Sequence, residues 1–400
     1  MTKRLLLVTG AAAVILAAVV LLRPAATDPA LRTPWGEPDL QGLWTYEVEI
    51  PLQRPARFGN REFLTDEERA AIDKERAEIL TRSAEVSDRR YERGTEQDVG
   101  GAYNAAIFTT HRPLGLRTSL IVDPPDGKIP PLTPEAEKRR AEIRAFQLAL
   151  LQATDVCKNN LPGCAGGKYG PPSPKRAETP PHYLTVATNR ARGPEDRSLA
   201  ERCMGALQPD FGGNTGFLLQ IIQAPGSVAI FYDTAQGQGR QRVIPVTANP
   251  HPPAQVRQWW GNSRARWEGD TLVVDVTNFS PKTLFQGSSE NLRLTERWRR
   301  VDADTIEYTV TMEDSTVWTR PWTVRQEYKK QDDVQNRIYK EPRCHEGNYG
   351  MTALLSGART EERAFAERRG PDPATRCTAG CGGFAAGFAD SGEESNPLVR

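Results

Sequence analysis

The chain has 400 residues with 52 basic and 51 acidic side chains, so its formal net charge is +1. This balance argues against a nucleic-acid-binding protein, which usually carries a concentrated basic face. Hydrophobic residues make up 38% of the chain, which is enough for at least one core. The 33 glycines and 31 prolines favour many turns and loops over long helical bundles.

The amino terminus is typical of an export signal. Lys3 and Arg4 precede an apolar run over 5–22. The length of this run falls between that of a signal-peptide core and that of a membrane-spanning helix. We therefore predict that residues 1–30 are either a cleaved signal peptide or an amino-terminal anchor in the inner membrane. Both alternatives predict a periplasmic or secreted location for the rest of the chain.

Two helices are predicted in the first half of the chain. Thr65 is a suitable N-cap for a charged helix that begins near 66 and ends between 80 and 86, because acidic residues follow it directly. Thr133 and Pro134 mark the start of a second helix, which we expect to end near 154. Strands are predicted over 42–50 and 116–122, the second ending in a proline-rich turn.

The second half of the chain is predicted to be mostly β. Alternation of apolar and polar residues over 305–314 indicates a strand with one buried face and one solvated face. A tight hairpin is predicted around Gly269. Further strands are expected over 216–222, 227–232, 240–246, 292–300 and 318–324. Residues 31–362 should therefore form one β-rich α+β domain, an antiparallel barrel or strongly curved sheet with two peripheral helices, long loops and an insertion over about 133–200. Residues 363–400 should be a poorly ordered tail.

The six cysteines agree with export, because an even number in an oxidising compartment favours disulfides. Cys157 and Cys164 flank a short turn, and Cys377 and Cys381 flank three residues. Cys203 and Cys344 remain and could pair across the fold. The sequence leaves the connectivity open.

Three segments resemble a family of uncharacterised exported bacterial proteins. They are WEGDTLVVDVTNF (267–279), LTERWRRVDADTIEY (294–308) and CHEGNY (344–349), and the likeness covers most of 33–362. This family implies export and lends no established chemistry. Separately, Gly42-x-Trp44 before a meander of strands resembles lipocalin-type barrels, which implies a closed barrel with a ligand cavity.

His345 and Glu346 are the first candidates for chemistry. A histidine beside a carboxylate suits general acid–base catalysis, and a disulfide at Cys344 would fix the local backbone. Adjacent strand residues point to opposite faces, however, so a structural role for His345 is the alternative. Arg117 is the candidate to stabilise an acidic ligand group if it points into the barrel. As an outer-face residue it would only be a solubilising charge.

Aromatic side chains concentrate in the β half, where they could line one cavity for a flat apolar or sugar-like ligand. Ordinary core packing is the alternative. Two histidines in proline-containing loops could contribute to the same site. The candidate ligand-binding residues are Trp259, Trp260, Trp298, Tyr308, Trp318, Trp322, His251 and His111.

These observations favour an exported protein that binds an apolar or aromatic small molecule in a barrel cavity. The first alternative is a cofactor-independent isomerase, cyclase or lyase that uses a His/carboxylate pair in that cavity. The second is an accessory subunit of an envelope complex. Metal-ligand spacings, phosphate loops and nucleophile elbows are absent from the sequence, so no metal and no cofactor are predicted.

Overall fold

The computed structural model describes residues 31–88, 113–204, 208–211, 218–233, 240–331, 349–379 and 381. Across these residues one antiparallel sheet has the strand order β5-β4-β3-β1-β10-β9-β8-β7-β6, with β2 beside β10. The sheet curves until its two outer strands meet, where Val246, directly after β5, forms a parallel bridge with Ala265 of β6. The fold is thus the β-rich, nearly closed antiparallel barrel that the sequence predicts.

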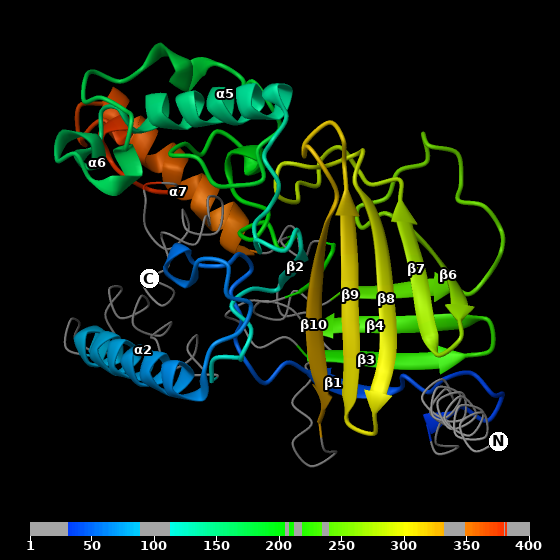
Figure 1. The fold of residues 1–400 in the computed structure, drawn as a ribbon. Helices are drawn as coiled ribbons and strands as arrows, with labels where there is room; N and C mark the ends of the chain where they lie inside the picture. Colours follow the sequence, from blue (N-terminus) through cyan, green and yellow to red (C-terminus); the bar gives the residue numbers. More distant parts are fainter. Residues whose placement is uncertain are drawn as a thin grey trace, which may run out of the picture. The chain divides into compact units, whose positions relative to one another are not determined.

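The strands bend around a shared interior. In Figure 1, β6 to β10 lie in front while β3 and β4 cross behind them. The strands are β1 (Gly42–Thr45), β2 (Ile121–Asp123), β3 (Leu218–Ala224), β4 (Ser227–Asp233), β5 (Arg240–Pro245), β6 (Asn262–Glu268), β7 (Thr271–Thr277), β8 (Arg293–Asp302), β9 (Thr305–Glu313) and β10 (Trp322–Lys330).

Strand periodicity determines which side chains enter the barrel. On β9, Ile306, Tyr308, Val310 and Met312 are buried while the residues between them are not. The same alternation holds on β10 and β8, so one residue in two from each strand packs in the interior. The opposite face carries ion pairs such as Arg299 with Glu307, which lie directly across β8 and β9.

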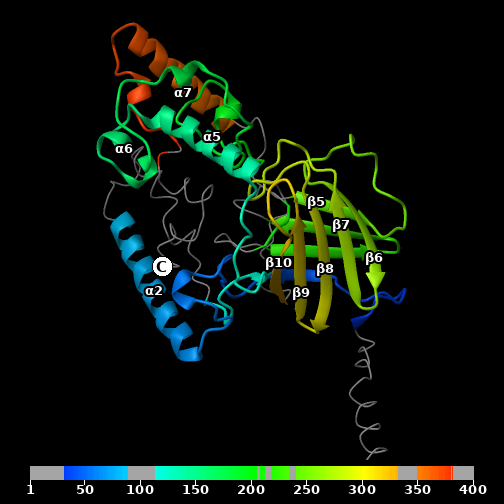
Figure 2. The same ribbon diagram turned by 45° about the horizontal axis from the view of Figure 1, so that its top comes forward.

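Among the described residues, the α-helices are α2 (Asp66–Asp88), α5 (Pro134–Leu151), α6 (Asp155–Lys158) and α7 (Tyr349–Ala366). Both predicted N-caps are confirmed. Thr65 and Glu68 form a reciprocal capping box, and the Thr133 hydroxyl accepts a hydrogen bond from the Ala136 amide. Helix α5 begins beside the connection between β9 and β10, since the Thr133 amide donates to the carbonyl of Val317. Figure 2 shows α5 and α7 side by side, as does Figure 1.

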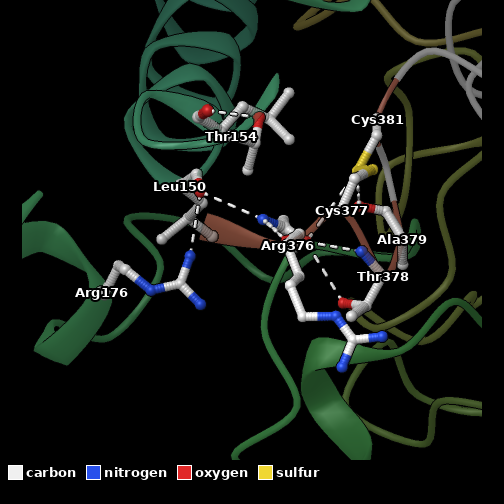
Figure 3. Close-up of a disulfide and its surroundings, with 10 residues drawn as sticks. Leu150, Thr154, Arg176, Arg376, Cys377, Thr378, Ala379 and Cys381 are labelled. Atoms are coloured by element: carbon white, nitrogen blue, oxygen red, sulfur yellow. Dashed lines mark hydrogen bonds between the residues drawn. A yellow bond between two sulfur atoms is a disulfide. The ribbon is translucent and has the colours of Figure 1, made fainter. Parts of the chain in front are cut away.

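Two disulfides pair cysteines that are close in the sequence. Cys157 is bonded to Cys164 and Cys377 to Cys381, as the spacing suggested. Figure 3 shows the second bond close to Leu150 at the end of α5. Asn189 connects the two regions, because its side-chain amide donates to the carbonyls of Leu150 and Arg376. The third suggested pair includes Cys344, which lies outside the described residues.

Several element boundaries differ from those predicted. The strands predicted over 42–50 and 116–122 shorten to β1 and β2, which cover Gly42–Thr45 and Ile121–Asp123. Helix α7 crosses the predicted boundary at 362, and the long loop after α5 contains α6 and short 3-10 turns. Residues 31–39 form a small unit of their own, in which the Thr33 amide donates to the Glu37 carbonyl.

The predicted export segment over 5–22 lies outside the described residues. Within the described ranges, no helix has both the length and the apolar character needed to cross a bilayer.

Gly261 and Gly269 provide a test of the β6–β7 hairpin. Both have positive φ, but a Cβ at Gly261 would lie 2.8 Å from the Thr277 carbonyl oxygen, whereas a Cβ at Gly269 would meet nothing within 4 Å. We expect Gly269→Ala to lower the free energy of unfolding by about 1 kcal/mol, from backbone strain alone. Gly261→Ala should cost at least about 1 kcal/mol more, because of the added clash. Urea unfolding of both variants checks this, and equal losses would contradict the hairpin geometry.

Candidate ligand site inside the barrel

A buried ion pair lies across the interior of the barrel. Glu296 comes from β8, between Leu294 and Trp298 on the inward face, and Arg242 comes from β5, two residues before the buried Ile244. The Glu296 side chain is 0% exposed and that of Arg242 is 4% exposed. Strand alternation places both charged groups in the core, because they share the inward face of their strands with buried apolar residues, Leu294 and Trp298 on β8 and Ile244 on β5.

The Arg242–Glu296 ion pair is bidentate. Arg242 donates from Nη1 to Glu296 Oε1 at 3.1 Å and from Nη2 to Glu296 Oε2 at 3.0 Å. Arg242 also donates to the hydroxyls of Tyr232 at 3.2 Å and Ser263 at 2.9 Å. Glu296 accepts further hydrogen bonds from the Tyr308 hydroxyl and from the Gln208 side-chain amide. Desolvation, which is costly for either ion, is therefore offset by a dense set of charge-assisted hydrogen bonds.

A second charge pair lies beside the first. Arg240 from β5 has a side-chain exposure of 0% and donates from Nη2 to Asp210 Oδ2 at 3.2 Å. Its guanidinium carbon is 4.3 Å from the centroid of the Tyr232 ring and 5.7 Å from that of Trp260. These distances suit cation–π contacts, which strengthen when the cation is desolvated. The interior thus holds two arginines and two carboxylates.

Aromatic rings surround this polar group. The ring centroids of Trp298 and Tyr308 are 4.2 Å apart, and Trp298 stacks on Tyr328 with centroids 5.9 Å apart. The indole N–H of Trp298 is buried and has no hydrogen-bond partner among the described residues. Buried donors are normally paired, so an acceptor on a bound molecule would satisfy this N–H.

The environment of the tyrosines keeps them neutral. Burial raises the pKa of Tyr308 and Tyr328 well above the ordinary value, and the negative charge of Glu296 acts in the same direction on both. Burial also raises the pKa of Tyr232, although Arg242 opposes it. Burial by itself lowers the pKa of Arg242, but the carboxylate of Glu296 raises it above the usual range. Burial raises the pKa of Asp210, while Arg240 acts against this shift.

Four of the predicted aromatic residues form two separate pairs. Trp298 and Tyr308 pack against each other beside the Arg242–Glu296 pair. Trp318 and Trp322 form an edge-to-face pair with centroids 5.5 Å apart, and Phe285 stacks on Trp322. Trp322 is opposite Met312, four residues along β9 from Tyr308, so the two groups occupy different levels of the barrel. Trp260 approaches Arg240 from a partly buried position, and Trp259 is also partly buried.

The other predicted residues lie elsewhere. Arg117 lies outside the barrel interior, where it donates to Glu62 Oε1 at 2.7 Å and covers the ring of Phe63. The ring of His251 is 2.9 Å from the amide oxygen of Asn262. His111, His345 and Glu346 lie outside the described residues.

Two surface hollows lie away from the barrel interior. A small one of about 10 Å³ is lined by Phe58, Leu64, Arg76 and Arg117 among others. An open one of about 370 Å³ lies beside α5 and includes His182, whose Nε2 is 2.7 Å from Glu142 Oε2. Within the described ranges, no three or more His, Cys, Asp or Glu side chains are grouped to hold a metal ion.

Sequence reasoning missed the interior charges, although the sequence contained a signal for them. On β8, Glu296 occupies the same alternation as Leu294 and Trp298, and on β5 Arg240 and Arg242 share the face of Ile244. A charged residue that occurs in register with apolar residues on a strand predicts a buried charge. Gln208 and Asp210 gave no such signal, because they belong to a loop.

No protein family model matches the chain, and neither does any curated protein. Among solved structures, an abundant heat soluble (SAHS) protein from Ramazzottius varieornatus is 14% identical, with 30% of this chain and 75% of that chain covered and a TM-score of 0.20. A mutant of the fluorescent protein UnaG is 17% identical, with 33% and 86% covered and a TM-score of 0.21.

The Arg242–Glu296 pair generates a stability prediction. Replacing either partner alone with Met leaves a buried charge without compensation, and we expect a loss of about 3–5 kcal/mol in the free energy of unfolding. The double variant R242M/E296M should lose clearly less than the sum of the single losses, because neither charge remains. Denaturant unfolding of the four proteins measures this coupling.

The matched control is the exposed pair Arg299–Glu307 on the outer face of the same sheet. We expect a coupling energy there of no more than about 1 kcal/mol, because solvent screens the pair. Similar coupling energies for the inner and outer pairs would contradict the desolvated geometry described for Arg242 and Glu296.

Alkaline titration tests the environment of the tyrosines. Tyr308 and Tyr328 have raised pKa values in the folded state, so the unfolded chain loses these protons first as the pH rises past about 10. Folding stability should therefore be fully present below that pH and decline above it. Absorbance at 295 nm should show these phenols ionising only together with unfolding. In Y308F the absorbance change that accompanies unfolding should be smaller. An unchanged amplitude would contradict the raised pKa of Tyr308 in the folded state.

Proposed function

We propose that this chain is an exported protein that binds an apolar or aromatic small molecule inside its barrel. One observation carries the proposal, namely the polar group around Arg242 and Glu296, enclosed by tyrosine and tryptophan rings in the barrel interior. A closed barrel of about eight or nine strands is wide enough for side chains or for one small ligand. A few convergent polar groups within an aromatic lining are the usual composition of such a site.

The energetics of the pair support a role in recognition. Replacing a buried ion pair with apolar side chains of similar volume is often neutral or stabilising, so packing alone does not require Arg242 and Glu296. The pair instead fixes charged and hydrogen-bonding groups at defined positions in the interior. Trp298 adds an indole N–H that has no partner among the described residues, next to ring faces that can cover a flat molecule.

Export is supported by the chemistry of the cysteines and by the amino-terminal sequence. The Cys157–Cys164 and Cys377–Cys381 disulfides are typical of oxidising compartments. The basic and then apolar order of residues 3–22 agrees with this, as does the likeness to exported bacterial proteins. A periplasmic or secreted location, with anchoring as the alternative to cleavage, is thus part of the proposal.

Native mass spectrometry of the protein purified from its own envelope fraction tests the proposed function. We expect one apolar or aromatic molecule per chain, released on organic extraction and identified by its mass. Trp298→Phe should lower the occupancy because it removes the indole N–H and reduces the ring area at the site. Trp35→Phe is the matched control, since Trp35 is 38% exposed and hydrogen-bonds to Glu37.

The other outcomes separate the alternatives. A ligand-free protein that co-purifies with other polypeptides would contradict the proposal and favour an accessory subunit of an envelope complex. A ligand-free monomer would favour an enzyme, whose substrate turns over and leaves.

A further inference from the structure

The two disulfides among the described residues differ in their access to solvent. In the Cys377–Cys381 bond, Cys377 is exposed and Cys381 is partly buried. In the Cys157–Cys164 bond, the two residues are 6% and 2% exposed. A thiolate has to reach a sulfur atom before it can break a disulfide, so access decides which bond reacts. An attacking thiol can therefore approach Cys377 from solvent, whereas the Cys157–Cys164 bond is shielded.

The loop that the Cys377–Cys381 bond closes completes the hydrogen bonding of a buried side chain. Asn189 is 3% exposed, and its Oδ1 accepts from the amide of Thr378 at 2.9 Å and from the hydroxyl of Thr378 at 3.2 Å. Its Nδ2 donates to the carbonyls of Arg376 at 3.0 Å and Leu150 at 3.3 Å. Figure 3 shows the loop close to Leu150 at the end of α5.

Helix α7 precedes this loop in the chain and has few shielded contacts of its own. None of its described side chains is buried, so its contacts are open to water. Arg359 donates to the carbonyl of Ala191, and Glu361 accepts from Arg376 at 2.6 Å. Because Arg376 directly precedes Cys377, opening the disulfide loosens the residue that pairs with α7.

We infer that the Cys377–Cys381 bond is a thiol–disulfide exchange site for a dithiol reductant, and that opening it releases α7 from the end of α5. One thiolate of the reductant attacks Cys377 Sγ, and Cys381 Sγ leaves with the bonding electron pair and takes up a proton. The second thiolate of the reductant then attacks the mixed disulfide and releases Cys377 as a thiol. The reductant is oxidised to a disulfide, and the chain gains two thiols.

The surroundings of Cys381 suit it as the leaving group. Cys381 packs against the buried cluster that contains Leu151, Cys157 and Cys164, which shields its sulfur from attack. Its Sγ is 2.9 Å from the carbonyl oxygen of Ala379 and 3.8 Å from Oδ1 of Asn189. A thiol is a weak hydrogen-bond donor, so the proton gained on reduction faces acceptors already in place. The inference goes beyond the proposed function and does not depend on it.

Thiol reagents applied to the purified full chain under native conditions test the site. After limiting dithiothreitol, alkylation and peptide mass spectrometry, we expect Cys377 and Cys381 to be labelled at least about tenfold faster than Cys157 and Cys164, because the buried bond has to open by local unfolding first. Glutathione, a monothiol, should form its mixed disulfide at Cys377 and leave Cys381 as the alkylated thiol.

Hydrogen–deuterium exchange tests the release of α7. After reduction, the amides of α7 should exchange at least about tenfold faster, while those of β9 in the same sample should be unchanged. The variant C377S/C381S should show the fast exchange with and without reductant. C157S/C164S is the matched control, in which α7 should still respond to the reductant, and β9 remains the reference if that variant does not fold.

Each part of the inference can fail on its own. Equal labelling of the two disulfides, or glutathione on Cys381, would overturn the exchange site. Unchanged exchange of the α7 amides after complete reduction of the Cys377–Cys381 bond would overturn the release of the helix. None of these results bears on the barrel ligand, which native mass spectrometry tests separately.

Discussion

Desolvation of charge inside a closed sheet is the constraint on which the rest of this structure depends. Glu296 has no contact with solvent, and its carboxylate accepts hydrogen bonds from an arginine, a tyrosine and a glutamine. These donors come from β5, β9 and the segment at 208–211, so satisfying one carboxylate brings together parts of the chain that are far apart in sequence. The aromatic rings around it then exclude the water that would otherwise weaken each bond.

The two faces of the sheet use charge in different ways. On the outside, Arg299 pairs with Glu307 across neighbouring strands at positions where solvent screens the attraction. On the inside, Arg242 and Glu296 are held in a low-dielectric interior where each lost partner is costly. Residues of the same kinds therefore form a solvent-screened surface on one face and a buried, hydrogen-bonded group on the other.

Much of the fold could be predicted from local sequence. The alternation over 305–314, the turn at Gly269 and the caps at Thr65 and Thr133 all depend on near neighbours, and each is present in the structure. The candidate site was harder to predict from the sequence, because it depends on which strands face each other across the barrel interior. Trp298 and Tyr308 were predicted as site aromatics, and the structure places them together. The alternation on β5 marks Arg240 and Arg242 as sharing the face of Ile244, but it does not indicate which strands they meet across the interior. Predicted residues in loops, such as Arg117 and His251, have local partners of their own.

The position of β1 in the sheet has a consequence for the order in which the barrel can assemble. β1 pairs with β3 on one side and β10 on the other, with Trp44 opposite both Leu219 and Lys330. Apart from these pairings with β1, from the pairing of β2 with β10 and from the bridge that closes the sheet, the strands from β6 to β10 pair with sequence neighbours, and so do those from β3 to β5. The β3–β5 and β6–β10 parts of the sheet can therefore each form from local contacts. Joining the two parts through β1 requires β10, the last of the described strands to be synthesised. Contacts of such long sequence separation are slow to form, so the first strand made is expected to be among the last to complete its pairing.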